Sequence, residues 1–157
     1  MNVYLKNLIQ KYRQKGILID TNLLLLYIVG SFDVELIALF KRTSRFTTDD
    51  FDKVSDFIKL FDKIIFTPHI VTEVSDFIGN KTDLQLLLKV YVEISEEHFI
   101  ESKKIVQKPE FIKFGLADTA IIETERQYLI FTDDNLLFGF LQNSNFDTVN
   151  LNQLRLV

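Results

Sequence analysis

The sequence predicts an α/β fold, a three-layer α/β/α sandwich in which helices cover both faces of a central parallel sheet. Two observations predict it. Short apolar runs typical of buried strands recur along the chain, and longer segments with apolar residues at helical spacing lie between them. The strand-like runs are residues 17–19, 64–66, 90–94, 128–131 and 146–151. Strands that alternate with helices pair in parallel through crossover connections, which produces this layered architecture.

Helical periodicity covers most of the chain before and between these runs. We expect helices over residues 3–13, 48–61 and 68–78, further helices that begin near Leu23, Ser95 and Gly115, and a helix that contains residues 136–141. Thr48 is a candidate N-cap, and Asp49 and Asp50 would stand in the first turn of the same helix. Gly79-Asn80 is a suitable helix stop, because both residues tolerate the left-handed backbone that ends many helices.

Length and composition predict one globular domain over residues 1–157. The chain is 47% hydrophobic, which is enough apolar material for a substantial core. We divide it into an N-terminal helical extension, residues 1–15, and a core, residues 16–155. The absence of cysteine excludes disulfides and thiolate metal sites. The sequence shows no signal peptide, and its longest apolar run is far shorter than the roughly 20 residues that a membrane span needs. We therefore expect a cytoplasmic protein without membrane contact.

The net charge also limits the function. A formal charge of −4 and a pI near 5.2 argue against non-specific coating of nucleic acid. They are compatible with a nuclease whose acidic residues are concentrated in a metal site.

Carboxylates occur where the predicted strands end. Ligands of open α/β sheets bind in the crevice beyond the carboxyl ends of the strands. Asp20 closes the first strand, and Asp133 and Asp134 follow the strand-like run 128–131 after one threonine. Glu73 lies in the second turn of the helix over residues 68–78, and Asp118 lies in the opening turn of the helix near Gly115. These acids are therefore candidates for a single site.

Each acid also has an ordinary structural explanation. Asp20 can cap the helix that begins near Leu23, and Asp133 or Asp134 can cap the helix over residues 136–141. Glu73 can be a solvated helix residue, and Asp118 can complement a helix dipole, which contributes less than about 1 kcal/mol at an exposed position. The convergence of all of them at one sheet edge is what favours a functional site.

Several carboxylates in one place repel one another, and a divalent cation relieves that repulsion. Oxygen-only ligands suit Mg²⁺ or Mn²⁺. His69 and His98 have no partner at metal-ligand spacing, so we expect surface or structural roles for both. A hydrated Mg²⁺ ion on carboxylates is the usual arrangement for binding phosphates, which suggests phosphodiester hydrolysis.

Four short motifs resemble those of the PIN domain family, metal-dependent nucleases best known as the toxins of toxin–antitoxin pairs. The motifs are ILIDTNLL at 17–24, TPHIVTEV at 67–74, GLADTAII at 115–122 and TDDNLL at 132–137. The resemblance implies a parallel sheet of strand order 3-2-1-4-5 and an acidic pocket formed by Asp20, Glu73 and Asp118. The family pattern Thr-x-Asp selects Asp134 over Asp133 as the fourth acid, although either could reach the pocket.

The resemblance also implies an endoribonuclease that leaves a 5′-phosphate, with RNA as substrate and a cognate antitoxin protein or a homodimer as possible partners. In this hypothesis Asp20, Glu73 and Asp118 hold one or two Mg²⁺ or Mn²⁺ ions, and Asp134 completes the site or orients the attacking water. Asn22 and Thr132 would fix the carboxylates, unless they serve only as turn and cap residues. The helix before the first strand and the long stretch over residues 31–63 depart from the compact toxins.

Binding of RNA requires positive charge, which the acids cannot supply. The candidates are Lys103, Lys104, Lys108 and Lys113, and also Lys41, Arg42 and Arg45. Taken singly, each of them is more often part of a solvated charged surface than a substrate contact.

Two other functions stay open. One is a PIN fold that binds RNA or protein without turnover. The other is a receiver-like Mg²⁺-binding signalling domain, which needs an acceptor aspartate after a central strand and a lysine after a later one; the end of the run 90–94 offers only Ser95 and Glu96.

Overall fold

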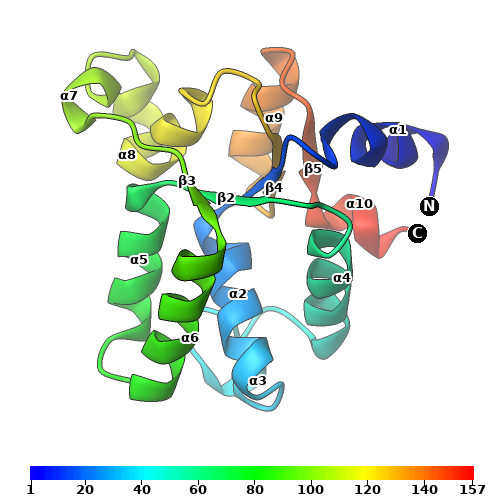
Figure 1. Ribbon diagram of the computed structural model, residues 1–157, viewed down its shortest axis with the longest axis vertical. Coiled ribbons are helices and arrows are strands. Elements are labelled where there is room, and N and C mark those ends of the chain that lie inside the picture. The colour runs from blue at the N-terminus through cyan, green and yellow to red at the C-terminus, as the bar shows by residue number, and fades with distance from the viewer.

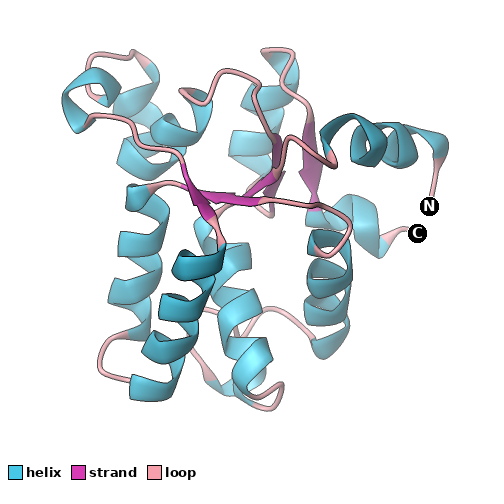
Figure 2. Ribbon diagram, viewed as in Figure 1, coloured by secondary structure: helices cyan, strands magenta, loops and turns pink.

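The computed structural model describes residues 1–157 and confirms the predicted α/β architecture (Figures 1 and 2). Five parallel strands form one sheet in the order β3-β2-β1-β4-β5. The strands are β1 (Ile17–Ile19), β2 (Ile64–Phe66), β3 (Glu96–Glu97), β4 (Leu129–Thr132) and β5 (Thr148–Asn150). The strand order is the one implied by the PIN resemblance.

Ten helices surround the sheet. They are α1 (Val3–Tyr12), α2 (Thr21–Phe32), α3 (Leu36–Leu39), α4 (Thr48–Ile58), α5 (Pro68–Ile78), α6 (Thr82–Ile94), α7 (Ser102–Ile105), α8 (Glu110–Ile122), α9 (Asn135–Asn143) and α10 (Leu151–Arg155). Helices α2, α4, α5 and α6 lie on one side of the sheet and α8 and α9 on the other (Figure 1). No helix has the combination of length and apolar character that crossing a membrane requires.

Helix α2 occupies the centre of its layer, against α4, α5 and α6. Four consecutive leucines, residues 23–26, are completely buried, because this helix is apolar on every side. Gly30 lets the ring of Phe51 from α4 approach closely, since a Cβ atom at this position would lie 2.2 Å from Phe51 Cδ2. The close packing of α2 therefore fixes the position of the end of β1 and of Asp20, which follows it.

Helix α1 joins the same core through Leu5, Leu8 and Tyr12. The Tyr12 hydroxyl donates a hydrogen bond to Asp147 Oδ2 at 2.8 Å, which ties the helix to the start of β5. Gly16 then turns the chain into β1 with a φ of 117°, a backbone conformation that favours glycine.

The prediction of a strand at residues 90–94 was wrong. These residues form the last turn of α6, and the strand β3 is the short pair Glu96–Glu97, which also rules out a helix beginning at Ser95. Leu84, Leu88 and Tyr91 are buried at helical spacing, so the apolar run belongs to a helix face. Strand β3 lies at the sheet edge with exposed charged residues, and it pairs with β2 at Ile65 and Phe66.

Several boundaries also differ from the predicted ones, and helix α4 ends at Ile58 rather than at residue 61. Thr47 rather than Thr48 caps α4, in a capping box with Asp50. Helix α8 begins at Glu110, five residues before the predicted position, and breaks at Gly115, whose φ is 80°. Asp118 nevertheless lies in the first turn after the break. Residues 146–151 contain β5 only at Thr148–Asn150.

Candidate functional site

A cavity of about 560 Å³ opens beyond the carboxyl ends of β1 and β4. Four of the predicted acids line it: Asp20, Glu73, Asp118 and Asp134. Asp20 follows β1, Glu73 comes from α5, Asp118 from α8 and Asp134 from the turn between β4 and α9. Segments separated by up to 114 residues in sequence thus contribute one carboxylate each, as the sequence predicts. Asn22 lines the same cavity.

Asp20 is the most buried of these acids, with 4% of its surface exposed. Its Oδ1 atom accepts a hydrogen bond from the backbone amide of Leu23 at 3.2 Å and caps α2. Its Oδ2 atom accepts a hydrogen bond from the hydroxyl of Thr132 at the end of β4. Burial raises the pKa of Asp20 to about 8; the charge of Asp133 adds to the rise, and the two hydrogen bonds oppose it.

Asp118 and Glu73 have perturbed pKa values for the same reason. Burial raises the pKa of Asp118 to about 7, and the neighbouring charges of Asp134 and Glu73 raise it further. Burial also raises the pKa of Glu73; Arg42 opposes that rise, while Asp76 adds to it. Full ionisation of these acids would therefore place more negative charge in the cavity than its surroundings stabilise.

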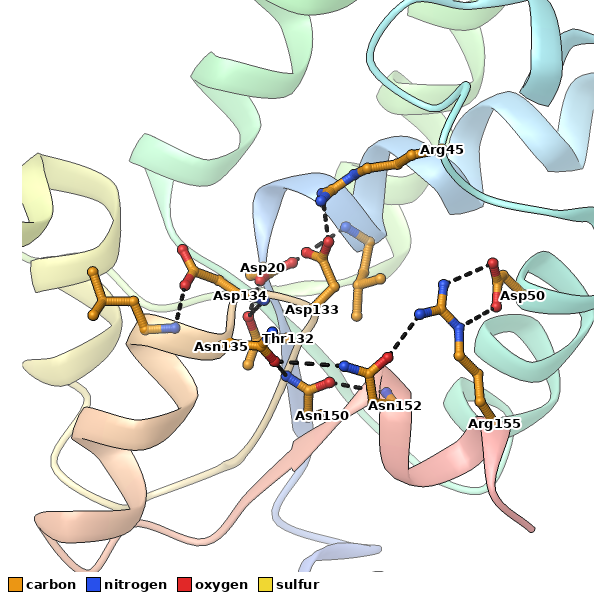
Figure 3. Close-up of polar contacts among 12 residues, drawn as sticks. Asp20, Arg45, Asp50, Thr132, Asp133, Asp134, Asn135, Asn150, Asn152 and Arg155 are labelled. Carbon is orange, nitrogen blue, oxygen red and sulfur yellow. Dashed lines mark hydrogen bonds and ion pairs between the residues drawn. The ribbon is translucent and has the colours of Figure 1, made fainter.

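The turn between β4 and α9 orients two adjacent aspartates differently (Figure 3). Asp134 caps α9, because its Oδ1 atom accepts hydrogen bonds from the amides of Leu136 at 2.8 Å and Leu137 at 3.0 Å. The Thr132 hydroxyl oxygen accepts a hydrogen bond from the Asp134 amide at 3.0 Å, so one threonine positions both Asp20 and Asp134. Thr132 is thus both a turn residue and a support for the acids.

Asp133 forms an ion pair with Arg45 from the segment between α3 and α4 (Figure 3). Its side chain is only 7% exposed, and its Oδ1 atom is buried without a hydrogen-bond partner. Burial raises the pKa of Asp133, and the Arg45 guanidinium is the main opposing influence. Asp134 and not Asp133 lines the cavity, although Asp133 is close enough to influence the charge of Asp20.

A polar network behind this turn was not predicted from the sequence. Asn150 donates a hydrogen bond to Asn135 at 3.2 Å, and Arg155 donates one to Asn152 at 2.7 Å (Figure 3). Arg155 also binds both carboxylate oxygens of the buried Asp50, at 2.7 and 2.9 Å. The network connects α10 and α4 to the residue that follows Asp134. Its members come from distant segments, so no local sequence pattern predicts the network.

His69 also lines the cavity. The sequence had predicted only a surface or structural role for it, outside the site. Its Nε2 atom lies 3.2 Å from Ser102 Oγ, and its Nδ1 atom is buried without a partner. Burial lowers the pKa of His69, which favours the neutral ring. The four-residue spacing to Glu73 on one helix is the signal that could have found it. The other histidine, His98, makes a hydrogen bond of 2.8 Å to the Tyr128 hydroxyl.

Arg42 is the cationic side chain on the cavity wall. Its guanidinium carbon lies 4.0 Å from the centroid of the Phe77 ring. The four predicted lysines, Lys103, Lys104, Lys108 and Lys113, do not line the cavity. Lys108 is paired with Glu123 at 3.4 Å, and Lys113 lies over the ring of Phe114. Of the predicted basic candidates, Lys41 does not line the cavity and Arg45 is engaged by Asp133.

No group of three or more His, Cys, Asp or Glu side chains in the structure has the geometry to hold a metal ion by itself. The chain matches no family model and no curated protein. Any functional proposal therefore depends on the chemistry of the cavity. The cavity combines buried oxygen donors, carboxyl groups with raised pKa values and one guanidinium.

Proposed function

We propose that the chain is a Mg²⁺- or Mn²⁺-dependent endoribonuclease that hydrolyses RNA phosphodiester bonds in the acidic cavity. One observation carries the proposal. Asp20, Glu73, Asp118 and Asp134 reach the same cavity from four elements, and burial raises the pKa of the first three. Such a cluster is unfavourable for folding unless the charges serve a cation, and perturbed carboxyl groups in a cleft are typical of functional sites.

The donor set fits a hydrated hard cation. Mg²⁺ keeps several waters and binds proteins through one or two carboxylates together with substrate phosphates. The acids therefore need not all touch one ion. When bound, the ion would activate a water molecule and stabilise charge on the phosphate.

The chain's own residues would prepare that site. The Thr132 hydroxyl and the Leu23 amide hold both oxygens of Asp20 in place. Asp134 has one oxygen engaged at the start of α9 and lines the cavity, so its other oxygen is available to a ligand or a water. Asp118 and Glu73 add negative charge from the α8 and α5 side.

The PIN resemblance is part of the same proposal. The sheet order 3-2-1-4-5 and the four acids at its carboxyl edge support it. If the chain is a toxin of this family, its partner is a cognate antitoxin protein, and the N-terminal helix and residues 31–63 are the segments in which it departs from compact toxins.

A PIN fold that binds RNA without cleaving it is the second candidate. The ion pair between Arg45 and Asp133 favours it, because the guanidinium already neutralises one acid beside Asp20.

Cleavage of a panel of structured and single-stranded RNAs with Mg²⁺ or Mn²⁺ tests the proposal. The wild type is compared with Asp20→Asn and Asp118→Asn, and with Asp56→Asn as the matched control, since Asp56 is an exposed residue of α4 outside the cavity. We expect metal-dependent cleavage by the wild type and the control, and none by the cavity variants. Equal cleavage by Asp20→Asn would refute the proposal, while RNA binding without cleavage by the wild type would favour the binding module.

A further inference from the structure

Two adjacent aspartates follow β4, yet only one of them faces the acidic cavity. Asp134 lines the cavity and Asp133 does not. The two carboxylates point to different sides of the same turn (Figure 3). Burial is the main cause of the raised pKa of Asp20 and the charge of Asp133 is the next, so Asp133 lies close to the site. Asp133 is therefore a carboxylate beside the cavity that the proposed chemistry does not use.

Arg45 is the residue that engages Asp133. Its guanidinium forms an ion pair with Asp133 Oδ2, while Asp133 Oδ1 is buried without a hydrogen-bond partner. A buried carboxylate in this condition is unfavourable unless a positive charge compensates it. Arg155 also lies within electrostatic reach of Asp133, but it is bound to both oxygens of Asp50. Asp133 thus depends on Arg45 for its counter-charge.

The segment between α3 and α4 presents Arg45 from a well-packed turn. The hydroxyl of Thr43, which is completely buried, donates a hydrogen bond to the Ile37 carbonyl at 2.9 Å. The Phe46 amide donates one to the Thr43 carbonyl at 2.9 Å, and Phe46 is itself buried. The guanidinium carbon of Arg45 lies 4.7 Å from the centroid of the Phe46 ring. Buried residues on both sides of Arg45 in sequence therefore hold its backbone in place.

We propose that Arg45 is a positioning residue of the acidic site. It keeps Asp133 as its own counter-ion, and this leaves Asp134 to serve the cation in the cavity. The inference rests on the metal dependence of the proposed function and adds a residue to it. Arg45 lies in the stretch over residues 31–63, where the sequence departs from compact toxins, so none of the four family motifs contains it.

Loss of either partner of this ion pair should change cation binding, in opposite directions. A guanidinium and a divalent cation both bind carboxylate oxygens, so they compete for Asp133. Without Arg45, Asp133 adds an uncompensated negative charge beside the cavity, and that charge attracts the cation. Without the charge of Asp133, the free guanidinium repels the cation. Removal of both charges restores the net charge of the wild-type pair.

Electron paramagnetic resonance of Mn²⁺ measures this affinity, because the signal of the free ion is lost when the protein binds it. The wild type is compared at pH 7 with Arg45→Gln, Asp133→Asn and the double variant. We expect Arg45→Gln to bind Mn²⁺ about tenfold more tightly, the lower end of the effect of residues behind metal ligands, and Asp133→Asn to bind it more weakly. The double variant should return to the wild-type affinity. Arg45→Lys should keep that affinity, because the ammonium group retains the charge.

Stability in EDTA separates this role from a merely structural one. Urea denaturation without metal should show that Arg45→Gln is less stable than the wild type, since Asp133 loses its counter-charge. Saturating Mn²⁺ should then stabilise Arg45→Gln more than the wild type. An ion pair that only supports the fold would lower the stability and leave the Mn²⁺ affinity unchanged.

Arg13→Gln is the matched control for the loss of a paired guanidinium. Arg13 pairs with the exposed Asp62 at 3.4 Å, and these two residues precede β1 and β2, at the amino ends of the strands. The control should bind Mn²⁺ like the wild type.

An Arg45→Gln variant that binds Mn²⁺ no more tightly than the wild type would overturn the inference, and so would a double variant that binds as tightly as Arg45→Gln. If Arg45→Gln does not fold, equal affinities of Asp133→Asn and the wild type would still overturn it.

Failure of the inference is distinguishable from failure of the proposed function. RNA cleavage by a wild type whose Mn²⁺ affinity does not depend on Arg45 would retain the nuclease and reject this role. The expected pattern of affinities in a protein that cleaves no RNA would retain the role and reject the nuclease. A wild type that binds no Mn²⁺ would reject both.

Discussion

Replacement of Asp20 by asparagine should change how stability depends on pH. The carboxyl group of Asp20 is ionised in the unfolded chain above about pH 5, because an aspartate without neighbours has a pKa near 3.9. In the folded protein its pKa is raised to about 8 by burial and by the charge of Asp133. Between pH 5 and 7 the folded state thus holds one proton more than the unfolded state at this position.

The sign follows from that difference. The raised pKa contributes stability below the unfolded pKa, and this contribution is lost as the pH rises towards the folded pKa. Each proton of difference lowers the free energy of unfolding by about 1.4 kcal/mol per pH unit, or about 3 kcal/mol from pH 5 to pH 7. Asparagine removes this slope and keeps the cap on α2, since Asn caps helices as well as Asp does.

Urea denaturation in EDTA at pH 5, 6 and 7 measures the effect. Far-UV circular dichroism is the suitable probe, because the chain has no tryptophan. We expect the wild type to lose stability with rising pH more steeply than Asp20→Asn, by about 1.4 kcal/mol per pH unit. The pKa of Asp118 is also raised, to about 7. Asp118 therefore adds the same pH dependence of stability to the wild type and to Asp20→Asn.

Asp56→Asn is the control, because Asp56 is exposed on α4 and pairs only with the exposed Lys59, at 3.5 Å. It should retain the wild-type slope. Addition of Mn²⁺ at pH 7 should raise the stability of the wild type and of the control, but not of Asp20→Asn. Parallel stability profiles of the wild type and Asp20→Asn in EDTA would show that Asp20 is not held in the environment described above.

Three further changes test the framework around the site. Arg155→Met should destabilise the protein by about 3 kcal/mol in urea denaturation at pH 7, because it leaves the carboxylate of Asp50 buried without its partner; the double variant with Asp50→Asn should recover part of the loss. Gly30→Ala should cost about 2 kcal/mol by the same measurement, since its Cβ would lie 2.2 Å from the Phe51 ring, and a smaller residue at position 51 should relieve it. Asp134→Ala should lose about 1 kcal/mol of cap energy as well as RNA cleavage, whereas Asp134→Asn should lose only the cleavage; retained cleavage by Asp134→Asn would remove this acid from the proposed mechanism.

The central strands could be predicted from the sequence because burial on both faces requires continuous apolar runs. Strands β1, β2 and β4 are such runs, and each was found within one residue of its observed bounds. Strand β3 could not be found this way. It consists of two exposed glutamates, and it is a strand only because its backbone pairs with β2, which is a long-range contact.

The run at residues 90–94 was assigned to a strand because it is a short apolar run of the kind that buried strands show. Val90 and Ile94 are in fact exposed on α6, while the buried face of that helix is made by Leu84, Leu88 and Tyr91. A run of five residues contains too little of a helical period to reveal this. The longer window from residue 82 shows the helical spacing.

The acids of the cavity could be predicted because the rule for them is topological: carboxyl ends of parallel strands meet at one edge. The rest of the cavity lining was predicted only in part. Arg42 was one of the basic candidates, whereas no strand end marks Phe77 or Phe114, and only tertiary packing brings these two rings to the cavity. The four lysines near Asp118 in sequence do not line the cavity, and one of them, Lys108, is paired with Glu123. Sequence proximity is a weak guide to side chains on helices.

The structural and functional explanations of Asp20 and Asp134 are compatible with each other. Both residues cap helices, α2 and α9, and both line the cavity. In a parallel sheet each helix begins where a strand ends, so a capping carboxylate at that point faces the crevice in which ligands bind. The helix amides and dipole stabilise its negative charge, while burial opposes that charge and raises the pKa of Asp20. A cap can thus hold a carboxylate in a fixed orientation for a cation, and this is why the Asn variants, which keep the cap and remove the charge, separate the two roles.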